Sequence, residues 1–230
     1  HRRGLLATGL LTWGRGPPAH RMDRALPVAL ASRSGTPHLQ CTGPIFQGAS
    51  LMSKVVLITG GSRGIGAASA RLAAQRGYAA CVNYRRERAA ADEVVRAIEA
   101  GGGRSIAVQA DVAVEADVLR LFETCDRLLG TLVALVNNAA VLETPMRVDA
   151  MDADRLARVF ATNIVGPFRC ARQAVRRMST RYGGQGGAIV NVSSAAARLG
   201  SGGEYVDYAA SKGAIDTMTM GLAREVAEEG

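Results

Sequence analysis

Histidine is nearly missing from this 230-residue chain, and its absence narrows the possible chemistry. The three histidines, His1, His20 and His38, all lie within the first fifty residues. The remaining chain therefore cannot form a Ser-His-Asp triad or a histidine-ligated metal site, and we predict no metal. A catalytic acid or base in that part must be another type of residue.

Cysteine and aromatic residues are scarce as well. The four cysteines, Cys41, Cys81, Cys125 and Cys170, are widely spaced and form no Cys-x-x-Cys motif. They argue against a metal knuckle or a disulfide framework and suit the reducing cytoplasm, where buried free thiols are their simplest interpretation. Aromatic residues make up 4% of the chain, so stacking platforms for nucleic-acid bases are not evident. No apolar run approaches the length of a membrane span.

The net charge of +8 is unevenly distributed. Residues 1–51 carry six arginines and one acidic residue, a net charge of +5, and the rest of the chain carries only +3. A surplus that small is usual for a solvated surface. A nucleic-acid binder that uses the basic segment is therefore the weakest function considered.

Residues 1–51 differ in composition from the rest. They hold five of the seven prolines and show no sustained periodicity, which indicates disorder. Met52-Ser53-Lys54 leads directly into the first apolar run, where a native start is expected. The segment is upstream sequence translated from an incomplete gene, an Arg-rich organelle transit peptide, or a real tail; we favour the first. The domain itself is expected over residues 52–230, in the cytoplasm, or in an organelle if a transit peptide precedes it.

Short apolar runs alternate with helical patterns from Lys54 onward. Strands are predicted over residues 55–59, 79–84, 105–111, 132–137 and 188–192. Helices are predicted from the glycine turn to 76, from the second strand to 100, and over 114–129, 152–181 (kinked at Gly166-Pro167) and 205–229. Near-continuous apolar strands between helices predict an α/β fold with a Rossmann-type, doubly wound parallel sheet.

A glycine-rich turn, Thr59 to Gly66, joins the first strand to the first helix. Backbone amides of such a turn, together with the helix N-terminus, can hold a pyrophosphate. The spacing of its glycines differs from Gly-x-Gly-x-x-Gly, the general fingerprint of dinucleotide-binding folds. We nevertheless expect dinucleotide contacts from the following residues: Gly60, Ser62, Arg63, Gly64, Ile65 and Gly66.

The charges near the second strand bear on the choice of cofactor. NAD-binding folds place an acid at the end of that strand, on the ribose 2′-hydroxyl, but here the residues are Asn83, Tyr84, Arg85 and Arg86. With Arg63 in the glycine turn, these arginines suit a 2′-phosphate. Ordinary solvated residues at a helix start remain the alternative for Arg85 and Arg86. We predict NADP rather than NAD, with contacts from Tyr84 and Arg85.

Tyr208 and Lys212 lie one helical turn apart on a predicted helix, fourteen residues after Ser194. The pKa of a tyrosine is ordinarily about 10, and a neighbouring ammonium favours the phenolate and makes the tyrosine a better acid–base group. A serine hydroxyl from another element can hold a carbonyl oxygen beside the phenol. Lys54 and Lys212 are the only lysines among 28 basic residues, so a lysine at this spacing is less plausibly incidental. The alternative is a solvated surface pair.

These motifs resemble the short-chain dehydrogenase/reductase family over residues 52–230. The family's Thr-Gly-x-x-x-Gly-x-Gly corresponds to Thr59 to Gly66, and its Asn-Asn-Ala-Gly to Asn137 to Ala140, with Ala140 in place of glycine. Its Asn-x-x-Gly corresponds to Asn163 to Gly166, and its serine and Tyr-x-x-x-Lys to Ser194 and Tyr208 to Lys212. Family members continue beyond the Tyr-Lys helix through further strands, so we expect this chain to lack the last two.

The resemblance implies further roles. Asp111 and Val112 match a position that contacts adenine, although Asp111 could instead cap a helix. Asn138, Ala139 and Ala140 would line the cofactor cleft. Asn163 would support a proton-relaying water, unless it only satisfies backbone groups at a kink.

The predicted activity is hydride transfer between NADP(H) and a carbonyl or alcohol. Tyr208 would be the proton donor, Lys212 would hold the nicotinamide ribose, and Ser194 would bind the carbonyl oxygen. Residues 203–208 look like relatives described as glucose-dehydrogenase-like or as oxoacyl-carrier reductases, which does not identify the substrate. A non-catalytic nucleotide sensor on the same fold is the alternative, and a homo-oligomer is expected for the complete protein.

Overall fold

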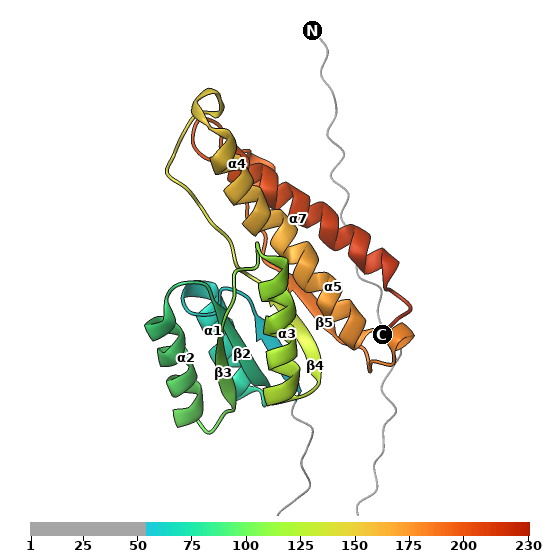
Figure 1. The fold of residues 1–230 in the computed structure, drawn as a ribbon. Helices are drawn as coiled ribbons and strands as arrows, with labels where there is room; N and C mark the ends of the chain where they lie inside the picture. Colours follow the sequence, from blue (N-terminus) through green and yellow to red (C-terminus); the bar gives the residue numbers. More distant parts are fainter. Residues whose placement is uncertain (1–53) are drawn as a thin grey trace, which may run out of the picture. The chain divides into compact units, whose positions relative to one another are not determined.

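Five parallel strands form the centre of the computed structural model, which describes residues 54–230 (Figure 1). They are β1 Val55–Ile58, β2 Ala79–Tyr84, β3 Ser105–Gln109, β4 Leu132–Asn137 and β5 Ala188–Asn191, in the order β3-β2-β1-β4-β5. The strand order reverses between β1 and β4, where a ligand crevice is expected at the carboxyl ends. The predicted Rossmann-type α/β fold is confirmed. The prediction for residues 1–51 lies outside the described residues.

Helices cover both faces of the sheet. They are α1 Gly64–Gln75, α2 Arg88–Ala100, α3 Glu115–Leu129, α4 Ala153–Phe160, α5 Gly166–Met178, α6 Ala196–Leu199 and α7 Val206–Glu225. Apolar residues of α1 and α2 pack against Val56, Ile58 and Val82 on one face. Residues of α3 and α5 pack against Leu57 and Cys81 on the other. Every apolar residue of β1 is buried, as the continuous apolar pattern of a two-sided strand requires.

The single helix predicted over residues 152–181 is wrong in detail. A π-helical segment, Ala161–Val165, separates α4 from α5, and the helix ends at Met178. Pro167 has no amide proton to donate to the carbonyl of Asn163, so the turn before it loses a helical hydrogen bond and widens. The predicted irregularity is therefore a π-helical segment that precedes Gly166.

Several predicted boundaries also change. Strand β3 ends at Gln109 rather than Asp111, because the Asp111 amide donates to Asp117 Oδ2 at 2.8 Å and leaves the sheet. Helix α7 ends at Glu225, and the following residues fold back so that Gly187 N donates to Gly230 O at 3.0 Å. Strands β1 and β5 each end one residue early, α1 ends at Gln75, and α3 begins at Glu115. Helix α6 was not predicted.

Within residues 54–230, no helix is both long and apolar enough to cross a membrane. The same residues contain no cluster of His, Cys, Asp and Glu side chains that could hold a metal ion.

Candidate active site

The predicted site residues lie at the edge of the sheet formed by the carboxyl ends of the strands. The glycine turn follows β1, Asn138 follows β4, and Ser194 lies three residues after the end of β5. Strand β4 pairs with both β1 and β5, so these segments are neighbours. Tyr208 belongs to the first turn of α7, which the chain reaches from this same edge.

Close backbone packing makes glycine necessary in the turn after β1. A Cβ at Gly66 would lie 2.5 Å from both Asn138 Nδ2 and Gly60 O, and Gly60 itself has φ +61°. Asn138 Nδ2 donates to Thr59 O and Gly60 O, while Thr59 Oγ1 accepts from the amides of Asn138 and Ala139. The segment after β4 thus braces the turn after β1.

Asn83 is a site residue that sequence reasoning missed. Its buried side chain accepts from Gly60 N at 3.1 Å and donates to Ala110 O at 3.0 Å. It therefore holds the glycine turn against the segment after β3. A lone amide within an otherwise apolar strand, Ala79–Tyr84, was the available signal, because a buried amide needs partners.

A crevice of about 370 Å³ lies beside these segments. It is lined by most of the predicted cofactor residues: Gly60, Ser62, Arg63, Tyr84, Arg85, Asp111, Val112, Asn138, Ala139 and Ala140. It is also lined by residues that were not predicted: Asn83, Arg86, Glu87, Ala110, Val141 and Thr162. Five predicted cofactor residues lie outside this lining: Gly64, Ile65 and Gly66 in the first turn of α1, and Tyr208 and Lys212 in α7.

Arg85 and Asp111 face each other across the crevice, with Arg85 Nε 2.9 Å from Asp111 Oδ2. Asp111 Oδ1 accepts from Ala113 N. Val114, not Asp111, is the N-cap residue of α3, so the helix-capping alternative for Asp111 is wrong. Arg63, exposed, occupies the N-cap position of α1, where its side chain caps no amide. A glycine turn, a helix start and exposed arginines together fit a dinucleotide.

Lys212 is buried beneath Tyr208. Its Nζ lies 5.7 Å from the centroid of the Tyr208 ring and donates to Val192 O, just after β5, at 2.6 Å. Burial lowers the pKa of Lys212, an effect that the charge of Asp216 opposes. Because the ammonium is fixed to β5, a solvated surface pair does not describe Tyr208 and Lys212.

Ser194, the predicted serine, and the preceding Ser193, a weaker candidate from the sequence, are bonded differently. Ser194 is half-buried, and its Oγ accepts from Ala196 N at the start of α6. Ser193 Oγ donates to Lys212 O at 3.4 Å. Ser193 is therefore engaged with the backbone of α7, whereas Ser194 lies in the turn that leads into α6.

Asn163 connects the crevice to the Tyr-Lys helix. From the π-helical segment its Oδ1 accepts from Val141 N at 2.8 Å, and its Nδ2 donates to Val141 O and to Ser211 Oγ. Ser211 Oγ in turn donates to Tyr208 O at 2.7 Å. Asn163 does satisfy backbone groups, but those of the loop after β4 rather than those of its own kink.

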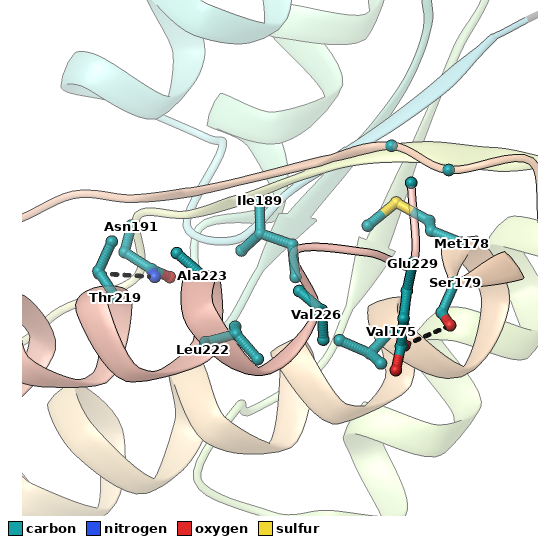
Figure 2. A pocket seen from close by; sticks show the side chains of 13 residues that line it. Val175, Met178, Ser179, Ile189, Asn191, Thr219, Leu222, Ala223, Val226 and Glu229 are labelled. Atoms are coloured by element: carbon teal, nitrogen blue, oxygen red, sulfur yellow. Dashed lines mark hydrogen bonds between the residues drawn. The ribbon is translucent and has the colours of Figure 1, made fainter. Parts of the chain in front are cut away.

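A second pocket, of about 210 Å³, lies away from these residues (Figure 2). It is enclosed by α5, β5 and the end of α7, with apolar walls that include Val175, Ile189 and Leu222. It shares no lining residue with the crevice, so it is not part of the candidate active site.

Comparisons with known proteins agree with this arrangement. The family model described as short chain dehydrogenase matches residues 54–230. An uncharacterized oxidoreductase of Escherichia coli, YgfF, is 54% identical over 176 residues, covering 76% of this chain and 71% of its own. A 3-oxoacyl-[acyl-carrier-protein] reductase of Bos taurus is 39% identical, covering 77% and 71%.

Solved structures give the same result. A short chain dehydrogenase from Burkholderia cenocepacia, in complex with NADP, matches with a TM-score of 0.72 and 34% identity, covering 77% of this chain and 70% of that one. A short-chain dehydrogenase/reductase from Serratia marcescens has a TM-score of 0.72 and 33% identity, covering 76% and 69%. With the parallel sheet, the glycine turn and the Tyr-Lys helix in place, the chain belongs to the short-chain dehydrogenase family of oxidoreductases.

Proposed function

We propose that this protein is an NADP(H)-dependent oxidoreductase that transfers hydride between the nicotinamide and a carbonyl or alcohol substrate. One observation carries the proposal. Hydrogen bonds run without a break from Val141 on the crevice wall, through Asn163 and Ser211, to the backbone of Tyr208. A dinucleotide crevice and an acid–base tyrosine are thereby held in a fixed relation.

The chain's own residues would manage the proton and the substrate oxygen. When bound, a reduced nicotinamide supplies the hydride that a carbonyl carbon accepts. Tyr208 donates the proton to the carbonyl oxygen, and Ser194 Oγ donates a hydrogen bond to that oxygen. Lys212 places a positive charge beside Tyr208 and would hold the nicotinamide ribose. Asn163 would support a water that relays protons toward Lys212.

Gly60, Ser62, Gly64, Ile65 and Gly66 would hold the pyrophosphate at the start of α1. Arg63 and Arg85 would contact a 2′-phosphate, and Tyr84, Asp111 and Val112 would contact the adenosine. Asn138, Ala139 and Ala140 would lie along the cofactor. The NADP in the Burkholderia relative supports this choice of cofactor.

We propose a carbonyl compound as the substrate in the reductive direction. Relatives named as 3-oxoacyl-[acyl-carrier-protein] reductase and tetrahydroxynaphthalene reductase support reduction of a carbonyl rather than a specific substrate. A panel should therefore include a 3-oxoacyl thioester, an aromatic ketone and, in the oxidative direction, glucose.

The decisive experiment follows NADPH oxidation with this panel, comparing the parent with Tyr208→Phe. The substitution removes the proton donor with little change in shape, so we expect kcat to fall about 10²- to 10⁴-fold while NADPH binding is kept. Tyr205→Phe, at the N-cap of α7, is the matched control and should keep most of the activity. Turnover near that of the parent in Tyr208→Phe would refute the role, and NADPH binding without any turnover would favour the nucleotide sensor.

We also propose a cytoplasmic homo-oligomer. Cys81, Cys125 and Cys170 are buried free thiols, which suits a reducing compartment. A groove between α5 and α7 exposes Phe168 and Tyr182, 52% and 58% accessible, and a second copy of the chain is the partner that this apolar face would bury.

A further inference from the structure

A buried ion pair, Arg155–Asp207, includes the residue that immediately precedes Tyr208, the candidate proton donor. Arg155, in the first turn of α4, meets Asp207, in the first turn of α7, through Nε–Oδ2 and Nη2–Oδ1 distances of 2.8 and 3.3 Å. The two side chains are 4% and 1% exposed. Two parallel hydrogen bonds between a guanidinium and a carboxylate fix orientation as well as distance.

Further hydrogen bonds connect the two residues of the pair to their surroundings. Arg155 Nη1 donates to Thr144 O at 2.7 Å, in the loop after β4, and Asp152 Oδ1 accepts from Arg155 N. Asp207 Oδ1 accepts from the amide of Tyr208 at 2.9 Å. The pair thus joins the loop after β4, the start of α4 and the backbone of Tyr208.

Stability alone does not account for such a pair. Taking two charges out of water costs about as much as their attraction returns, and well-packed apolar residues of similar volume are often equally stable. Burial raises the pKa of Asp207, but hydrogen bonds from Arg155 and the Tyr208 amide, with the charge of Arg155, leave that pKa below its ordinary value. The carboxylate is therefore charged at neutral pH, and the pair supplies direction where apolar packing would supply only contact.

We propose that Arg155 and Asp207 are positioning residues for Tyr208, fixing the rotation of the first turn of α7 and with it the direction of the phenol. This inference rests on the proposed function. The loop after β4 also contacts the loop before α7 directly, because Met146 N, two residues after Thr144, donates to Glu204 O at 2.8 Å. Neither Arg155 nor Asp207 lines the cofactor crevice, so we expect their replacement to affect cofactor binding little.

The test replaces both partners by apolar residues in the double variant Arg155→Met, Asp207→Leu. It should fold and bind NADPH within about threefold of the parent, with kcat at least tenfold lower, since misplaced acid–base groups lose rate rather than affinity. Arg158→Met is the matched control, because Arg158 is exposed, lies one turn along α4 and pairs with Glu143 in the same loop; its kcat should stay within about twofold of the parent. A folded double variant with the kcat of the parent would overturn the proposal.

A second measurement does not depend on activity. In protein labelled with ¹³Cζ-tyrosine, the Tyr208 signal is identified by its loss in Tyr208→Phe. It should shift or broaden in the double variant, while the signals of Tyr78 and Tyr182, on other elements, stay in place. If the parent reduces no carbonyl but this shift occurs, the proposed function is wrong and the positioning role is supported. An unchanged Tyr208 signal in the double variant would refute the positioning role.

If the double variant does not fold, the single variant Arg155→Lys tests the positioning role instead. Lysine keeps the charge but has no planar fork to serve Asp207 and Thr144 together. We expect a smaller loss of kcat, of severalfold, with KM for the substrate changed less than kcat and a moved Tyr208 signal. An unchanged kcat and an unchanged signal in Arg155→Lys would contradict the inference.

Discussion

Arg85 is already engaged in an ion pair at the place where a 2′-phosphate would bind. Its partner Asp111 is 23% exposed and Arg85 itself is 46% exposed, so solvent screens the pair and breaking it costs at most about 1 kcal/mol. A phosphate carries more charge than a carboxylate and can take over the guanidinium. The ion pair therefore keeps Arg85 at the crevice without blocking its use.

Cofactor preference is the prediction that follows from Arg63 and Arg85. We expect NADPH to bind at least tenfold more tightly than NADH, a difference of about 1.4 kcal/mol, in a fluorescence titration. The double variant Arg63→Ser, Arg85→Ser should lose most of that difference. Arg88→Ser, an exposed arginine of α2 outside the crevice, should keep it, and equal affinities in the parent would contradict the assignment.

Lys212 makes stability depend on pH in a direction that can be worked out. Burial lowers its pKa in the folded protein below the value of about 10.4 in the unfolded chain. Between those two pKa values the unfolded chain binds more protons, so stability rises with pH. The cost of burying the charge is complete below the folded pKa and disappears above the unfolded one.

The comparison that isolates this effect is with Lys212→Met, which carries no charge. Denaturant unfolding between pH 7 and 10 should show the free energy of unfolding of the parent increasing relative to that of the variant as the pH rises. Other groups titrate in both proteins and cancel. A difference that is flat, or that falls with pH, would mean that burial does not govern the charge of Lys212.

Elements bounded by local signals were predictable, and those that depend on distant contacts were not. Strands β2 and β4 have the predicted ends, and α2 stops at Ala100 before three glycines, because turn residues act within a few positions. Helix α4, the π-helical segment and α5 were predicted as one helix because the periodicity continues across them.

The same division holds in the candidate site. Tyr208, Lys212 and the glycine turn carry short spacings that a sequence displays. The Arg155–Asp207 pair joins residues 52 positions apart, and Asn83 acts on Gly60, 23 positions away. Such contacts depend on the order of strands and helices in the fold, so no local sequence pattern predicts them.

The junction of β1 and α1 offers a test at the scale of an element. Gly66→Ala would place a methyl group 2.5 Å from Asn138 Nδ2 and from Gly60 O, so the bracing of the turn must give way. We expect a loss of about 1–3 kcal/mol in stability together with weakened NADPH binding. Gly221→Ala, in α7 with no atom within 4 Å of the added Cβ, should instead be neutral or stabilise by up to about 1 kcal/mol. A Gly66→Ala variant that binds NADPH like the parent would show that the close packing is not needed.

At the scale of the whole described domain, the sheet has an edge strand, β5, with an exposed apolar residue. Strand β5 pairs only with β4 among residues 54–230, and Val190 at its centre is 53% exposed. The neighbouring residues Ile189 and Asn191 line the apolar pocket between β5, α5 and α7 (Figure 2). An apolar edge strand of a parallel sheet is a template for pairing with other chains.

We therefore expect this chain to self-associate through β5, separately from the discrete oligomer proposed for the groove between α5 and α7. Val190→Lys places a charge on the edge, which opposes strand pairing, and should lower light scattering and the sedimenting fraction at high protein concentration without lowering the melting temperature. Val148→Lys, at an exposed position on a 3₁₀ turn distant in sequence from β5, is the matched control and should scatter like the parent. A discrete oligomer that persists in Val190→Lys would locate that contact away from the sheet edge, whereas a parent chain that stays dispersed at every concentration would show that the β5 edge recruits nothing.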